Sequence, residues 1–131
     1  MVPHLPHDDV RVRLAPSPIA GIGVFALTAI RTGTEIFAND ARAIRWVSAA
    51  VLEQPDLQPW QRAFYDDFAI RMGDQLGCPD SFDLLTTGWF LNEPIDGMSP
   101  NVRATADFRF VAARNVKAGE ELTISYDSFS R

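Results

Sequence analysis

Two glycines, Gly21 and Gly23, stand immediately before an apolar run of the chain, with Ile22 between them. Because glycine has no Cβ, the backbone at such positions can approach a bound molecule closely. Glycines are also common in turns, so the pair on its own is compatible with either role. The segment is therefore a candidate binding site for a small molecule.

A second candidate is the segment 92–101, which holds two prolines and one glycine in ten residues and cannot form regular structure. Loops of defined shape often carry binding or catalytic residues. The loop begins at Asn92 and ends at Asn101, and both side chains offer an amide to a ligand. Both asparagines are equally compatible with a role as turn formers.

Tyr126, near the end of the sequence, is the third candidate, because its phenol can both donate and accept a hydrogen bond. The alternative is a strand tyrosine with one face in the core. His4 and His7 offer metal ligands beside two aspartates, but a solvated terminus explains this group better.

The elements that must position these residues begin with a repeated phrase. Residues 24–36 return as residues 110–122, with the glycines of the two copies at Gly33 and Gly119, an offset of 86 residues (119 − 33). Each copy is typical of a strand, a turn whose glycine has φ > 0, and a second strand. Two such hairpins around a different middle predict a pseudo-symmetric β scaffold with a site between its halves. Glu35 and Glu121 recur within the copies, where capping or pairing at a strand start is favoured over catalysis.

The middle of the chain differs from this scaffold. Apolar residues at helical spacing predict a helix over Arg42–Glu53, and Pro59 favours the start of a second short helix. Residues 41–66 are therefore interpreted as a helical insertion, followed by a strand over Phe68–Met72 and a short apolar stretch at 82–91 that is compatible with a helix. Residues 1–10 are expected to form a loosely held lead-in.

Length and composition narrow the class of protein. The 131 residues, 47% of them hydrophobic, predict one domain over 1–131. A net charge of −5 disfavours binding to nucleic acid and is compatible with a basic partner. One cysteine, Cys78, excludes an internal disulfide and a cysteine-rich zinc cluster. No signal sequence or membrane-length segment is expected, which favours a cytoplasmic protein; a homodimer is compatible with the sequence.

Three motifs in order resemble those of the SET domain family, which contains most protein-lysine methyltransferases. Gly21-Ile22-Gly23 resembles the family's Gly-x-Gly segment. Asn92-Glu93-Pro94 and Ser99-Pro100-Asn101 resemble its Asn-His-Ser-Cys-x-Pro-Asn loop with a short expansion. The run 119–126 resembles Gly-Glu-Glu-Leu-Thr-x-x-Tyr without a gap. The resemblance extends from about Val10 to Asp127.

This resemblance implies a mostly β (α+β) fold, a β-clip with a threaded pseudoknot loop and a small helical insertion. It also implies an S-adenosylmethionine-dependent transfer of methyl groups to a lysine amine in a protein substrate, without a metal. Tyr126 would be the catalytic residue, and Asn101 would hold the threaded loop. The methyl donor would be bound by Gly21, Ile22, Gly23, Asn92 and the main chain of Glu93. The lysine channel would be lined by Tyr65, Phe68, Phe90 and Phe129.

The chain departs from the family pattern in two places. Glu93 stands where the family usually has His, and the Cys-rich zinc tail that commonly follows the tyrosine is absent. These departures leave open a catalytically silent SET-like module that binds the donor or a peptide. A third interpretation comes from residues 113–120, which also resemble antifreeze-like β-clip modules that bind small sugars or acids.

Overall fold

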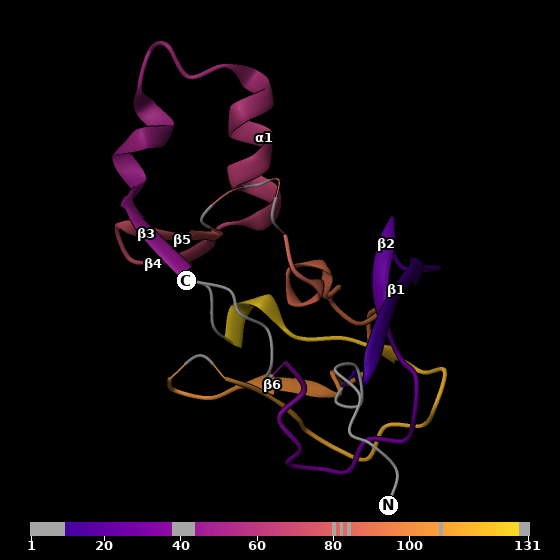
Figure 1. Ribbon diagram of the computed structural model, residues 1–131. Helices are drawn as coiled ribbons and strands as arrows, with labels where there is room; N and C mark the ends of the chain where they lie inside the picture. Colours follow the sequence, from indigo (N-terminus) through magenta and orange to yellow (C-terminus); the bar gives the residue numbers. More distant parts are fainter. Residues whose placement is uncertain are drawn as a thin grey trace, which may run out of the picture.

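The computed structural model describes residues 10–37, 44–79, 81, 83, 85–107 and 109–128, and these form mostly short strands with one α-helix (Figure 1). In chain order the elements are β1 (Val12–Pro16), β2 (Ile22–Ala26), β3 (Ile44–Ser48), η1 (Ala49–Glu53), α1 (Pro59–Phe68), β4 (Ile70–Met72), β5 (Gln75–Pro79), η3 (Thr87–Phe90), β6 (Val102–Ala104), β7 (Phe110–Ala112), β8 (Glu121–Leu122) and η4 (Tyr126–Ser128). They form sheets of order β1-β2-β8, β3-β5-β4 and β6-β7, all with antiparallel pairing.

The two copies of the repeat pair with each other. Ile30 and Val116, which are equivalent residues of the two copies, exchange backbone hydrogen bonds of 2.9 and 2.8 Å. Strand β2 of the first copy pairs with β8 of the second copy. The prediction of two separate hairpins is therefore wrong, because each arm takes its partner from the other copy. The predicted pseudo-symmetry is present in this exchange.

The turn glycine of each copy donates a backbone hydrogen bond to the other copy, so the pairing of the copies is symmetric. The N–H of Gly33 donates to the carbonyl of Ala112 at 2.8 Å, and the N–H of Gly119 donates to the carbonyl of Ala26 at 2.7 Å. Their φ angles are 84° and 85°, which confirms the predicted left-handed turns. The core lies where the copies meet, and its fully buried aliphatic side chains are Val24, Ile30, Val102, Val116, Leu122 and Ile124.

The C-terminal segment lies between two stretches that are far from it in sequence. The N–H of Ile124 donates to the carbonyl of Asn92 at 3.0 Å, and the N–H of Val102 donates to the carbonyl of Thr123 at 2.9 Å. Both bridges are parallel. The beginning and the end of the loop 92–101 thus flank the final residues of the scaffold.

The side chain of Asn101 joins the end of the loop 92–101 to the C-terminal segment. It is 1% exposed, its Oδ1 accepts from the N–H of Thr123 at 2.7 Å, and its Nδ2 donates to the carbonyl of Glu121 at 2.9 Å. The amide therefore satisfies a buried donor and an acceptor of the last strand. This confirms the expectation that Asn101 is mainly structural.

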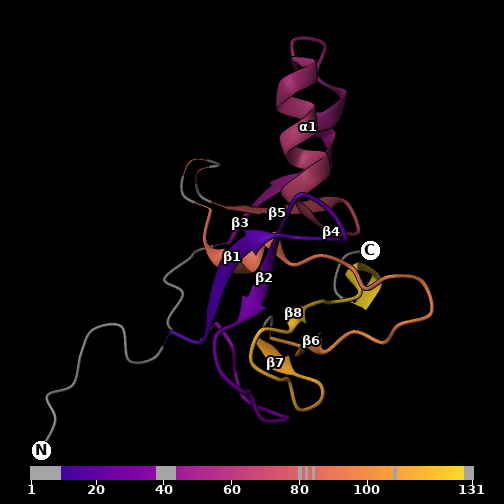
Figure 2. The ribbon, with the colours of Figure 1, turned by 90° about the vertical axis from the view of Figure 1, so that its right-hand side faces the viewer.

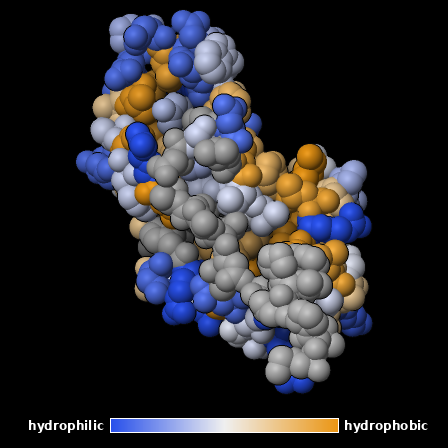
Figure 3. Space-filling view, in the orientation of Figure 1, coloured by the Kyte–Doolittle hydropathy of each residue, from blue (hydrophilic) through white to orange (hydrophobic). Residues whose placement is uncertain are grey.

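The middle of the chain projects from the scaffold, with α1 at its far end (Figures 1 and 2). The predicted helix over Arg42–Glu53 is wrong for Ile44–Ser48, which form strand β3 against β5, because pairing overrides a weak helical period. Only Ala49–Glu53 is helical, and Ser48 caps it by accepting from the N–H of Ala50. The helix predicted to start at Pro59 is confirmed but continues to Phe68, so the strand predicted from Phe68 begins only at Ile70. In Figure 3 the surface is hollowed between this projecting part and the part that carries β1 and β2.

Candidate functional site

The glycine segment and the loop 92–101 meet at the side chain of Asn92. Its Nδ2 donates to the carbonyl of Ala20 at 3.0 Å and to Oε2 of Glu121 at 3.0 Å. Gly21, with φ of 45°, follows Ala20 directly, and Glu121 belongs to the Gly-Glu-Glu-Leu run. All three motifs therefore reach one place in the fold.

Gly23 leaves space that a side chain from a distant part of the sequence occupies. A Cβ at this buried position would lie 2.3 Å from Oε2 of Glu121 and 3.0 Å from the Cβ of Ser17. Glycine here makes room for the carboxylate of Glu121, and its expected contact with a bound molecule stays a prediction. At Gly21, by contrast, a Cβ would meet nothing within 4 Å, and the following Ile22 is 50% exposed. The exposed part of this glycine segment is therefore its first half, Gly21 and Ile22.

Tyr126 is the first residue of η4, and both its hydroxyl and its backbone N–H donate hydrogen bonds. Its hydroxyl donates to the carbonyl of Leu91 at 2.6 Å, and its backbone N–H donates to Oε2 of Glu93 at 3.2 Å. Burial, and secondarily the nearby Glu93 carboxylate, raises the pKa of Tyr126 above its usual value. The phenol therefore keeps its proton at neutral pH and acts as a donor to Leu91.

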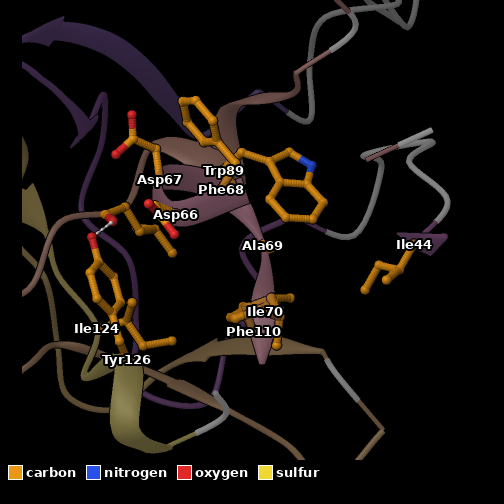
Figure 4. Close-up of a pocket in the computed structure, with 12 residues that line it drawn as sticks. Ile44, Asp66, Asp67, Phe68, Ala69, Ile70, Trp89, Phe110, Ile124 and Tyr126 are labelled. Carbon is orange, nitrogen blue, oxygen red and sulfur yellow. Dashed lines mark hydrogen bonds between the residues drawn. The ribbon is translucent and has the colours of Figure 1, made fainter. Parts of the chain in front are cut away.

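A cavity of about 210 Å³ opens beside this tyrosine, where the end of α1 meets η3 and the C-terminal segment (Figure 4). Its walls include Asp66, Asp67, Phe68, Trp89, Leu91, Phe110, Ile124 and Tyr126. The dashed line in Figure 4 is the bond from the Tyr126 hydroxyl to Leu91. The cavity is a mainly apolar space with a phenol on one wall and two carboxylates on another.

The aromatic residues predicted for a channel separate into two places. Phe68 lines the cavity, and its ring packs edge to face on Phe90 with centroids 5.8 Å apart. Phe90 itself packs against the core. Tyr65 lines a different hollow, together with Trp60 and Phe64 of the same helix α1. Phe129 lies outside the described residues.

Several residues of the site were not predicted from the sequence. Trp89 precedes Phe90, and Asp66 and Asp67 precede Phe68, but none of the three stands in a motif. A signal existed for Glu121, which lies inside the strongest motif and was interpreted as a pairing residue at a strand start. Ser17, which hydrogen-bonds Glu121, lies in a Pro-Ser-Pro turn that suggests only a strand end.

The described residues contain neither a candidate metal centre nor a candidate membrane-spanning helix. No group of three His, Cys, Asp or Glu side chains in this part of the chain is arranged to hold a metal ion. His4 and His7 lie outside it. The described helices also include none with the length and apolar character that crossing a membrane requires.

Comparison with known proteins assigns the family. The SET domain family model matches residues 21–127, most of the chain, and no curated protein matches. A Plasmodium falciparum protein named as a candidate histone methyltransferase superimposes with a TM-score of 0.54 at 22% identity, over 88% of this chain and 92% of that one. The chain belongs to the SET domain family.

A second structural neighbour is much larger. It is a humanized mutant of the Chaetomium thermophilum Polycomb Repressive Complex 2 bound to an inhibitor, with a TM-score of 0.59 at 19% identity. The match covers 90% of this chain but 15% of that chain. Both neighbours share the mostly β fold of this chain.

Proposed function

We propose that this protein is an S-adenosylmethionine-dependent methyltransferase that acts on lysine side chains of a protein substrate. The observation that carries the proposal is the cavity beside Tyr126, placed next to the point where the glycine segment meets Asn92. The histone methyltransferase assignment of one neighbour and the protein complex formed by the other support a protein substrate. The proposal includes the threaded pseudoknot, which is supported by the parallel bridges of Ile124 and Val102.

The residues present fit a methyl donor that carries an amino acid and an adenosine. Asn92 turns its Nδ2 toward Ala20 and Glu121, while its Oδ1 has no hydrogen-bond partner among the described residues and can accept from an ammonium group. The exposed side chain of Ile22 and the open backbone at Gly21 offer an apolar edge nearby. S-adenosylmethionine, when bound, supplies a methyl group on a positively charged sulfur.

The cavity would prepare the lysine. Phe68 and Trp89 provide an apolar wall that excludes water from an entering side chain. Because desolvation disfavours the ammonium, this wall lowers the pKa of the amine and favours the neutral form that can attack a methyl group. Asp66 and Asp67 on the same cavity would attract the ammonium before it is desolvated.

Tyr126 would orient the reacting groups. The bond from its hydroxyl to the Leu91 carbonyl fixes the position of the phenolic oxygen, and Tyr126 lines the cavity, so this oxygen would serve as an acceptor for the reacting groups. An acceptor of this kind stabilises polarised C–H groups and the developing ammonium. No proton transfer by Tyr126 is required, in agreement with its raised pKa.

The proposal predicts binding of both S-adenosylmethionine and its demethylated product, in a one-to-one ratio, by the purified protein. Calorimetry at protein concentrations that detect micromolar Kd values measures this, and radioactive methyl transfer to a lysine-rich protein extract measures turnover. No heat with either compound would overturn the methyltransferase assignment. Binding without transfer to any extract would instead favour a silent SET-like module, for which the replacement of His by Glu93 is the supporting observation.

A second prediction concerns Glu93. Glu93→Gln keeps an oxygen that can accept from the N–H of Tyr126, so we expect donor affinity within about threefold of the parent. Glu93→Ala removes that acceptor, and we expect turnover to fall about three- to tenfold as Tyr126 loses an anchor. Calorimetry and initial rates on the two variants check this. A hundredfold loss of donor affinity in Glu93→Gln would mean that the carboxylate itself contacts the ligand.

A further inference from the structure

Glu121 is surrounded by groups that connect three segments of the site. The hydroxyl of Ser17 lies 2.9 and 2.8 Å from its two carboxylate oxygens, and Nδ2 of Asn92 lies 3.0 Å from Oε2. Gly23 leaves the space that the carboxylate occupies. Glu121 is half-buried in this setting, so these bonds are partly shielded from water.

The direction of each hydrogen bond in this cluster follows from the chemistry of its members. The oxygen of Ser17 accepts from the backbone N–H of Ile19 at 3.0 Å and lies 3.4 Å from that of Ala20, so its own proton is directed to Glu121. The carbonyl of Ala20 and the carboxylate of Glu121 can only accept, and both face the same end of Asn92. The end of the Asn92 amide that faces these two acceptors must therefore be its NH₂ group.

The pseudo-symmetry of the fold shows that this use of Glu121 is particular to one copy of the repeat. Its equivalent in the first copy is Glu35, whose carboxylate lies 3.8 Å from Arg109 in a largely exposed ion pair. The equivalent glutamate of the repeat thus forms a surface ion pair in the first copy and contacts the Asn92 amide in the second copy. A structural need of the repeat alone does not explain the contacts of Glu121.

We propose that Glu121, assisted by Ser17, is a positioning residue that fixes the amide of Asn92 so that Oδ1 faces the methyl donor and accepts from its α-ammonium group. This inference rests on the proposed function. It extends that function by making recognition of the amino-acid part depend on a carboxylate that does not contact the donor.

Glu121→Gln tests the proposal because it changes only the hydrogen-bond pattern. The Ser17 hydroxyl still needs an acceptor, so the new side chain offers its oxygen to Ser17 and its NH₂ to Asn92. Asn92 then loses the charge-assisted bond that, together with the Ala20 carbonyl, holds its NH₂ inward, so its Oδ1 is no longer fixed toward the donor's ammonium. Glu35→Gln is the matched control, since it removes the same charge at the equivalent position of the other copy.

The measurement compares two ligands on the same samples. S-adenosylhomocysteine carries the α-ammonium group, whereas methylthioadenosine has the same adenosine thioether without the amino-acid part. In Glu121→Gln we expect the Kd of S-adenosylhomocysteine to rise about ten- to hundredfold, the effect of losing a charge-assisted hydrogen bond, and that of methylthioadenosine to stay within about threefold. Glu35→Gln should leave both constants unchanged.

Each other outcome has a definite meaning. Equal weakening of both ligands would show a merely structural role and overturn the inference, as would unchanged affinities. A parent protein that binds neither ligand would overturn the proposed function itself, and this inference with it. If melting curves show that Glu121→Gln does not fold, Ser17→Ala is compared in its place, and the same selective loss, about three- to tenfold, is expected.

Discussion

Replacement of Tyr126 by Phe is expected to reduce methyl transfer about ten- to a thousandfold while donor affinity stays near that of the parent. The phenolic oxygen is the acceptor on the cavity wall, and its loss costs transition-state stabilisation of about 1.4 to 4 kcal/mol. The variant also loses the bond to the Leu91 carbonyl, which costs about 1 kcal/mol of folding stability. Initial rates, donor affinity and melting temperature are measured on the same two samples.

The alternative for Tyr126 gives the opposite pattern. A tyrosine that only completes the packing of its segment would lose about 1 to 3 kcal/mol of stability on loss of its hydroxyl, and its turnover would hardly change. Transfer at the parental rate in the Phe variant would therefore remove Tyr126 from the chemistry. The side chain is 40% exposed, which is more than a packing role requires.

The largest effect on stability is expected for Asn101→Ala. The substitution leaves the N–H of Thr123 and the carbonyl of Glu121 without their partners in a buried place and adds a small cavity. Each unsatisfied buried group costs about 1 to 3 kcal/mol, so we expect a loss of about 3 kcal/mol in the free energy of unfolding. Urea denaturation, monitored by tryptophan fluorescence, measures the change.

Asn115→Ala is the control for this prediction. Asn115 also joins the two copies, because its Oδ1 accepts from the N–H of Thr32 at 2.9 Å, but this contact is exposed to water. Water replaces the lost acceptor, so we expect a change of about 1 kcal/mol or less. Equal losses in the two variants would contradict the role of Asn101 as a buried fastener.

The repeated phrase allowed much of the scaffold to be predicted. Its glycines gave the turns, and its aliphatic residues, such as Ile30 and Val116, form the core. It did not reveal that the copies pair with each other, because a strand pattern reports which residues alternate and not which partner they have. For the same reason Ile44–Ser48 was predicted as helix: its contact with β5 is a tertiary property.

The candidate site was predictable only where residues stand in motifs. Glu93, which follows Asn92, accepts from the N–H of Tyr126, and Asn101 accepts from the N–H of Thr123; the binding and catalytic roles that the resemblance implies for these residues stay predictions. The wall residues Asp66 and Trp89 come from α1 and η3, whose sequences carry no motif, so their positions could be known only from the fold. The reason for Gly23 was likewise invisible, because the atom that fills its place belongs to a residue about a hundred positions away.

The cross-pairing of the two copies also bears on how the chain acquires its fold. Ile30 pairs with Val116, and β2 pairs with β8 as well as with the neighbouring β1, so the contacts between the two copies join residues that are far apart in sequence. Folds dominated by such contacts have a high contact order, and closing the long intervening loop makes them slow to form. During synthesis the apolar residues of the first copy must wait until residues 110–122 have left the ribosome. The first copy thus emerges with its future core exposed, and residues 110–122 close that core once they have been made.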